Sequence, residues 1–166
     1  LRDRNPMIVY PGNSQGRHPR EGGARGVVLV EVDDERQIQI EFVAVDSVRW
    51  QRINLDIEGI ADGPALFAEL SEQVSRLLAE ADGRHLVYQV NLVGRGPANR
   101  MLSRARAVDG LAGQLNERWL RDEPFAFCGS ITDETKSPID RQTWRDRQDF
   151  VGYLISFVDE AVNDEA

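Results

Sequence analysis

Residues 26–57 alternate between hydrophobic and polar side chains, which is the pattern of β-strands. Apolar residues recur at every second position in residues 26–32 and again in residues 38–44, on either side of the polar stretch 33–36. A third apolar stretch covers residues 48–57. We therefore expect three consecutive strands that pair as an antiparallel meander.

Residues 58–166 combine helical and strand patterns. Asp62-Gly63-Pro64 supplies a cap residue and a first-turn proline for a helix that ends before Gly83. The further elements expected are a strand over residues 84–93, a helix around residues 108–119, a strand over residues 125–131 and a helix over residues 143–162. The predicted fold class is α+β, with a boundary between residues 1–57 and residues 58–166.

The densest cluster of polar side chains lies in a loop, residues 13–21, that follows a short apolar run. The loop reads Asn-Ser-Gln-Gly-Arg-His-Pro-Arg-Glu and offers amide, guanidinium, imidazole and carboxylate groups. Arg17 or Arg20 could make bidentate contacts to a phosphate, and His18 could act as a general acid. From composition alone, a solvated surface loop is the simpler interpretation.

Composition limits the class of protein. The chain has 166 residues, enough for one domain of ordinary size or for one domain with an appendage. Its 20 Lys and Arg against 28 Asp and Glu give a net charge of −8, which opposes general binding to nucleic acid but leaves room for a local basic patch. No apolar run approaches the ~20 residues of a membrane-spanning helix, and no signal peptide is recognisable. We expect a cytoplasmic protein without a membrane partner, and a first residue other than Met suggests part of a longer protein.

The sequence offers few groups for metal binding or covalent catalysis. The single cysteine, Cys128, cannot form an internal disulfide and is expected to be a small buried residue. Two histidines cannot build a histidine-rich site, and catalytic metal sites use three or more protein ligands. His85, at the start of a strand, is expected to be structural. We predict that this chain alone holds no metal.

Residues 10–21, Tyr-Pro-Gly-Asn-Ser-Gln-Gly-Arg-His-Pro-Arg-Glu, resemble a motif of bacterial DNA-repair exonucleases of the SbcD and YhaO type. In that family, part of the calcineurin-like metallophosphoesterase superfamily, the motif reads Tyr-Pro-Gly-Asn-x-Gln-Gly-Arg-His-x-x-Glu. The resemblance extends through residues 42–50 and more weakly, through residues 135–140, to Leu154. Structural roles are expected for three matching residues of the second stretch, Asp46, Arg49 and Trp50.

The resemblance implies that the full-length protein hydrolyses phosphodiester bonds of DNA with two metal ions, typically manganese. The family's metal ligands, in Asp-x-His, Asn-His and Gly-His-x-His motifs with a further Asp and His, precede this segment, and none of these motifs occurs in this chain. The chain would then be a C-terminal part that is inactive alone, because two-metal hydrolysis needs both ions. Residues 1–57 would be the last strands of a catalytic sandwich with an active-site-adjacent loop, and residues 58–166 a small α/β capping domain.

By the same resemblance, the loop would lie beside the metal centre of the full-length protein. The candidates for phosphate contacts are Asn13, Gln15, Arg17 and Arg20. His18 is a candidate for proton transfer or for supporting a metal ligand, and not for ligation itself. The implied partners are DNA and an SMC-like ATPase subunit. Because strands taken from a larger sheet expose an apolar face, we also expect a homodimer through residues 7–50.

Two other interpretations of the sequence stay open. The chain could be a stand-alone protein-interaction module that has no nuclease activity and needs neither metal nor DNA. It could also be an autonomous phosphoesterase whose metal site uses His18 and scattered carboxylates, although so few ligands make this the weaker alternative.

Overall fold

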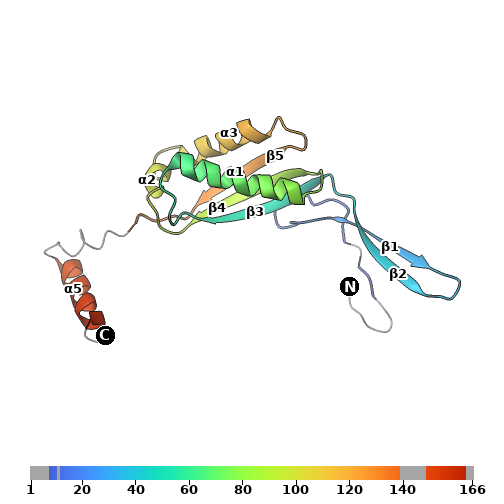
Figure 1. Cartoon of the computed structure of the whole chain (residues 1–166), viewed down its shortest axis with the longest axis horizontal. Helices are drawn as coiled ribbons and strands as arrows, with labels where there is room; N and C mark the ends of the chain where they lie inside the picture. Colours follow the sequence, from blue (N-terminus) through green and yellow to red (C-terminus); the bar gives the residue numbers. More distant parts are fainter. Residues whose placement is uncertain (1–7, 11, 139–148, 164–166) are drawn as a thin grey trace. The chain divides into compact units, whose positions relative to one another are not determined.

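The computed structural model describes residues 8–10, 12–138 and 149–163 (Figure 1). The chain divides into two compact units, Leu1–Lys136 and Ser137–Ala166, and each is described by itself. The first unit contains β1 (Gly26–Val32), β2 (Ile38–Ala44), β3 (Val48–Asp56), α1 (Gly63–Glu80), β4 (His85–Val93), α2 (Asn99–Leu102), α3 (Ala107–Trp119) and β5 (Ala126–Asp133). The second contains α5 (Phe150–Asn163).

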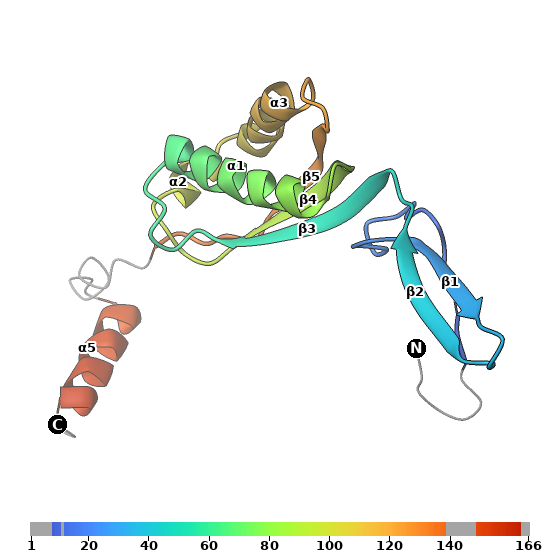
Figure 2. The ribbon, with the colours of Figure 1, turned by 45° about the vertical axis from the view of Figure 1, so that its right-hand side comes forward.

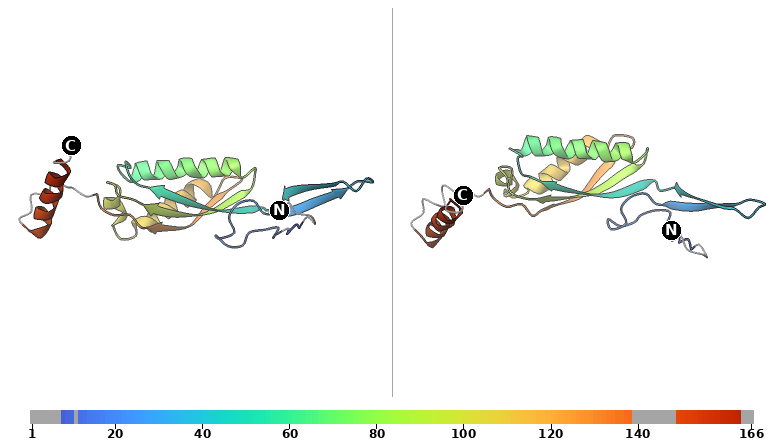
Figure 3. Two further views of the ribbon diagram at one scale, coloured as in Figure 1. Left: turned by 90° about the horizontal axis from the view of Figure 1, so that it is seen from below. Right: turned by 60° about the horizontal axis from the view of Figure 1, so that its bottom comes forward.

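The core of the first unit is a parallel three-stranded sheet in the order β3-β4-β5. The helical connections between its strands place α1 and α3 over one face, as right-handed crossovers require, and Figure 3 shows α1 along that face. Alternate residues of β4 are fully buried beneath the helices, namely Leu86, Tyr88, Val90 and Leu92. They form one hydrophobic cluster with apolar residues of β3, α1, α3 and β5.

The β1–β2 hairpin forms a second sheet, in which the two strands pair antiparallel. The prediction of a three-stranded meander is therefore wrong at its third strand, because β3 pairs in parallel with β4 and not with β2. Period-two alternation identifies a strand with one buried face, but it does not identify the strand's neighbour. The division into domains at residues 57 and 58 stays a prediction, although β3, from the first segment, pairs with β4, from the second.

One face of the β1–β2 hairpin is entirely apolar. Its directly opposed pairs are Val28–Phe42, Val30–Ile40 and Val32–Ile38. At least half of the surface of Val30, Val32, Ile38 and Phe42 is exposed, and Figure 2 shows no helix of the first unit over the hairpin. Because isolated two-stranded hairpins are only marginally stable in water, this face needs a cover that the described residues of the first unit do not supply.

The ends of α1 agree with the sequence prediction. The Asp62 carboxylate accepts a hydrogen bond of 2.9 Å from the Ala65 amide, and Pro64 lies in the first turn. The helix ends at Glu80, before Gly83, whose φ of +76° is in the left-handed region. The last helix was predicted over residues 143–162; α5 is described from Phe150, and residues 143–148 lie outside the described part of the chain.

Cys128 is buried in β5, as predicted, with 3% of its surface exposed. Burial raises the pKa of its thiol to about 11, and burial likewise raises the pKa of the neighbouring Tyr88 phenol. Both groups are therefore neutral at physiological pH, and the thiol is a poor nucleophile there.

The Asp46 carboxylate joins the hairpin to the parallel sheet. Its side chain is fully buried, and its two oxygens lie 3.1 Å from Arg49 Nε and 3.1 Å from Arg84 Nε. Arg84 also donates to the Ala44 carbonyl at the end of β2, and Arg49 donates to the Glu80 carbonyl at the end of α1. One carboxylate thus connects β2, β3, α1 and the start of β4, which agrees with the structural roles expected for Asp46 and Arg49.

The substitution Asp46→Asn should lower the free energy of unfolding by about 3–5 kcal/mol, because it leaves the largely buried Arg49 guanidinium without a counter-charge and Arg84 with only the exposed Asp82 as its partner. Urea denaturation followed by circular dichroism measures this change. Asp82→Asn is the matched control, since Asp82 also pairs with Arg84 but its side chain is 88% exposed, so its loss should cost about 0–1 kcal/mol. Equal effects of the two substitutions would show that the Asp46 cluster does not hold the junction.

Candidate functional site

The loop of residues 13–25 lies along the outer edge of β3 and is fixed there mainly by Gln15. The Gln15 amide oxygen accepts hydrogen bonds from the Ser47 amide at 2.9 Å and from the Ser47 hydroxyl at 3.2 Å. Its amide nitrogen donates to the Val48 carbonyl at 2.7 Å. A second attachment follows at Gly23, whose amide donates to the Trp50 carbonyl at 3.1 Å. The loop therefore takes the place of a neighbouring strand along the first half of this edge.

Gly16 allows the loop to turn closely over Trp50. The Trp50 indole donates a hydrogen bond of 3.1 Å to the Gly16 carbonyl. A Cβ atom at position 16 would lie 2.9 Å from the Glu21 carbonyl oxygen and 3.2 Å from Trp50 Cδ1, closer than side-chain carbons normally approach. Any other residue would push the loop away from β3, so this glycine is required by close packing and not by a special backbone angle.

The Glu21 carboxylate is hydrogen-bonded to residues at the start and in the middle of the same loop. Its carboxylate accepts hydrogen bonds from the Arg17 amide at 2.8 Å and from the Asn13 side chain at 3.3 Å. The hydrogen bond from the Arg17 amide, with smaller contributions from Asn13 and from the nearby Arg25 and Arg17 charges, lowers the pKa of the Glu21 carboxyl below its ordinary value. The charged form of Glu21 thus stabilises the observed loop conformation.

Three side chains of the loop that carry charged or ionisable groups face solvent. Arg17, His18 and Arg20 are exposed, and neither guanidinium group has an ion-pair partner among the described residues. His18 Nδ1 accepts a hydrogen bond of 3.1 Å from the Arg20 amide, which leaves Nε2 as the nitrogen free to exchange a proton. A rigid loop that presents two guanidinium groups and an imidazole is suited to binding an anion such as a phosphate group.

A metal centre is not assembled around these groups by the described residues. No group of three or more His, Cys, Asp or Glu side chains in the described ranges is arranged to hold a metal ion. Among the same residues, the structure contains no helix that is long and apolar enough to cross a membrane. The site as described can therefore bind and orient an anion and move a proton at His18 Nε2, while metal chemistry would need ligands from elsewhere.

Comparison with known proteins places this chain in a family. Residues 50–136, just over half of the chain, match the family model described as metallophosphoesterase YhaO, middle domain. The chain belongs to the YhaO middle-domain family. An uncharacterized metallophosphoesterase YhaO from Bacillus subtilis (strain 168) is 28% identical over 133 residues, which cover 80% of this chain. No solved structure matches the chain.

The YhaO match covers the parallel sheet and its helices, from Trp50 in β3 to Lys136 after β5. The aligned region spans only 32% of the Bacillus subtilis protein, about a third of that relative's length. The loop and the β1–β2 hairpin lie outside the family model. Because the matched region is described as a middle domain, the C-terminal position expected from the sequence stays a prediction.

Within this YhaO-family chain, the loop residues named from the sequence divide into two groups. Asn13 and Gln15, predicted as phosphate contacts, are hydrogen-bonded within the fold, whereas Arg17, His18 and Arg20 face solvent. The structure adds positioning residues that the sequence analysis did not assign to the site: Glu21, Ser47 and Trp50. The only sequence signal for them was their presence in the two stretches that resemble the exonuclease family.

The substitution Glu21→Ala should release the Arg17 amide and increase its hydrogen exchange rate at least tenfold, measured by NMR. Glu31→Ala, on the exposed hairpin, is the control and should leave the Arg17 amide unchanged. Because the pKa of the Glu21 carboxyl is lowered in the fold, its stabilising effect is complete above the ordinary value of 4.5 and is lost only as the pH falls through the lowered pKa. An NMR titration in which Glu21 protonates at or above 4.5 would contradict this account of the loop.

Proposed function

We propose that this chain is the non-catalytic part, including the capping domain, of a DNA-repair nuclease, and that the full-length protein hydrolyses phosphodiester bonds at DNA ends with two manganese ions. Membership of a metallophosphoesterase family supports the phosphoesterase chemistry. The observation that carries the proposal is the loop of residues 13–21, which holds Arg17, His18 and Arg20 exposed on a fixed backbone.

The loop suits a supporting role beside a metal centre. A two-metal site neutralises the attacking and leaving oxygens of a phosphodiester, but other charges on the phosphate strand still need partners. Arg17 and Arg20 would supply these contacts, and His18 would transfer a proton or support a metal ligand. Asn13 and Gln15 would act by holding the backbone that carries these three residues.

The manganese ions would be held by ligands outside this chain. The described residues supply no group of three ligands, and the loop's one inward carboxylate, Glu21, is already hydrogen-bonded to the Arg17 amide. In this proposal the metal ions, when bound, would supply activation of a water molecule and charge neutralisation of the leaving oxygen, while the residues of this chain would bind and orient the DNA phosphates. The chain alone would then be inactive.

The β1–β2 hairpin supports the proposal that residues 1–57 complete the catalytic sandwich of the longer protein. Three apolar cross-strand pairs form one face of the hairpin, and this face is exposed in the described part of the chain. The inner face of a β-sandwich consists of such alternating apolar residues. Residues 58–166 would follow as the capping domain, with DNA and an SMC-like ATPase subunit as partners in the cytoplasm.

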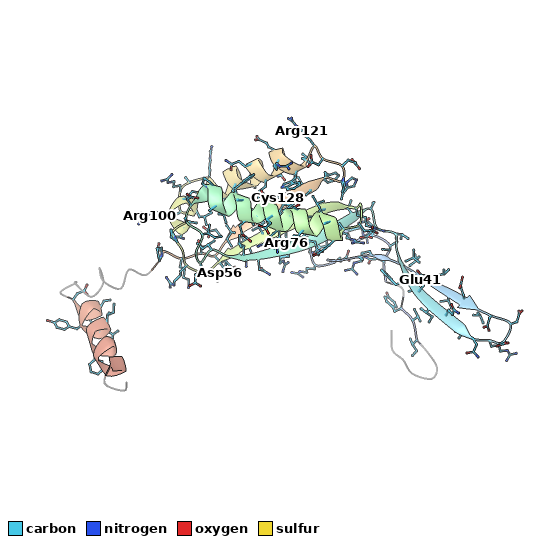
Figure 4. All side chains as sticks on the ribbon, in the orientation of Figure 1. Glu41, Asp56, Arg76, Arg100, Arg121 and Cys128 are labelled. Carbon is cyan, nitrogen blue, oxygen red and sulfur yellow. The ribbon has the colours of Figure 1, made fainter. Side chains whose placement is uncertain are left out.

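The proposal is tested in the full-length protein by changing Arg17 and Arg20 separately to Ala. Each change should reduce the rate of Mn²⁺-dependent hydrolysis of duplex DNA ends by roughly 10- to 100-fold, because a hydrogen-bonded charge contact to phosphate contributes about 1.5–3 kcal/mol. Arg121→Ala, at an exposed position after α3, is the control (Figure 4). Loss of activity should be relieved at low salt if the arginines bind phosphate.

Two results would overturn the nuclease proposal. One is a full-length protein that hydrolyses no phosphodiester bond in DNA with Mn²⁺, which would favour the stand-alone interaction module. The other is calorimetric titration of this chain alone with Mn²⁺ that shows tight binding of two ions, which would favour an autonomous site at His18. We expect no measurable heat of Mn²⁺ binding.

The isolated chain should form a homodimer through residues 7–50, with the apolar hairpin faces of two copies in contact. Sedimentation analysis should show a dimer at micromolar concentration. Phe42→Lys, on the apolar face, should shift the chain to monomer, whereas Gln39→Lys, on the opposite face of β2, should not. A clean monomer at high concentration would contradict the homodimer.

A further inference from the structure

A groove of about 510 Å³ lies between the first turn of α1, the segment after α2 and one face of α3. Its lining is mainly apolar, with contributions from Phe67 of α1, Met101 of α2 and Leu111 of α3. Clefts that hold ligands or partner side chains have volumes in this range, roughly 300–1,000 Å³. The groove is formed entirely by residues of the first unit and is separate from the loop of residues 13–21.

The rim of the groove carries positive charge on an otherwise acidic chain. Residues 95–108 contain four arginines and no acidic residue, whereas the whole chain has a net charge of −8. Arg104 and Arg106 line the groove and are exposed, and neither has an ion-pair partner among the described residues. Figure 4 places Arg100, also exposed, on α2 beside this end of the unit.

Gly110 lines the groove and leaves space for another molecule to approach the backbone of α3 closely. It lies within α3, where glycine is less favourable than any other residue except proline. A Cβ atom at position 110 would meet no other atom of the described residues within 4 Å, so packing among those residues does not require glycine there. The face of α3 along the groove consists of Gly110 with Ala107, Leu111 and Gln114, so it is partly apolar and includes two small residues.

We propose that this groove is a docking site for an acidic amphipathic α-helix of a partner protein. Apolar anchors of the helix would enter between Phe67, Met101 and Leu111, and acidic residues beside them would pair with Arg104 and Arg106. Helices that dock in grooves use apolar residues spaced at i, i+3, i+4 and i+7, and small residues on the groove wall let the two backbones approach. An apolar floor has no counterpart on a DNA backbone, which favours a protein ligand over nucleic acid. The proposal does not depend on the nuclease function.

The probe is a fluorescently labelled synthetic helix with Leu at i, i+3, i+4 and i+7 and Glu at most other positions, titrated with the whole chain and followed by anisotropy. We expect saturable binding. A peptide with Lys in place of Glu, and one with Ser in place of Leu, should each bind at least tenfold more weakly. Arg104→Glu should weaken binding of the acidic helix at least tenfold, whereas Arg121→Glu should not.

The substitution Gly110→Leu, with Gly113→Leu as its matched control, separates docking from folding. Both glycines are exposed in α3 with open space where a side chain would begin, but only Gly110 lines the groove. Neither change should lower the melting temperature, because leucine favours the helix. Only Gly110→Leu should weaken peptide binding, by at least tenfold.

Three results would overturn the docking proposal. One is equal weakening by Gly110→Leu and Gly113→Leu. Another is binding of the acidic helix that is unchanged when Leu is replaced by Ser, because the interaction would then be electrostatic only. The third is displacement of the helix by a DNA duplex whose own binding is weakened by Arg104→Glu but not by Gly110→Leu. That result would make the groove a nucleic-acid-binding surface.

Discussion

The buried carboxylate of Asp46 is the interaction on which the arrangement of the first unit depends. A fully buried charge is tolerated only when it is paired and hydrogen-bonded. Here Arg49 donates a hydrogen bond to Asp46 Oδ2, and Arg84 pairs with Oδ1 while it donates to the Asp46 backbone carbonyl. Each arginine also donates to a backbone carbonyl of another element, Arg49 to Glu80 at the end of α1 and Arg84 to Ala44 at the end of β2. The hairpin, the edge strand β3 and the helix above it are thereby fixed at one point.

The loop that carries the candidate functional residues is held in position by hydrogen bonds to this junction. Gln15 bonds to Ser47 and Val48, the two residues that follow Asp46, and the Asp46 amide itself donates to the Arg25 carbonyl at the end of the loop. A shift of residues 45–49 would therefore move both ends of the loop. The backbone that carries the exposed side chains of Arg17, His18 and Arg20 is therefore attached to the segment that the Asp46 ion pairs hold.

The sequence was a good guide to local structure and a poor one to pairing. The cap at Asp62, the alternation in β4 and the buried position of Cys128 follow from local patterns and are present in the structure. The neighbour of β3 could not be predicted, because its parallel partner is separated from it by the whole of α1. In the loop, the motif pointed to the right segment, but only three-dimensional contacts separate Gln15 and Glu21, which face the fold, from the residues that face solvent. The groove beside α3 could not be predicted from the sequence either, because residues of α1, α2 and α3 come together only in the folded chain.

The loop residues that face the fold and those that face solvent differ in chemistry, and this difference determines which groups can contact a ligand. Its amide, glycine and carboxylate residues hold the loop in position, whereas its cationic and imidazole groups face solvent and can meet a ligand. Such groups can attract and orient an anion and transfer a proton, and in the nuclease that we propose the metal ions would be held by ligands outside this chain. In that proposal the reactive centre lies in a second part of the full-length protein, and the exposed apolar face of the β1–β2 hairpin is the surface through which we propose that this part is attached.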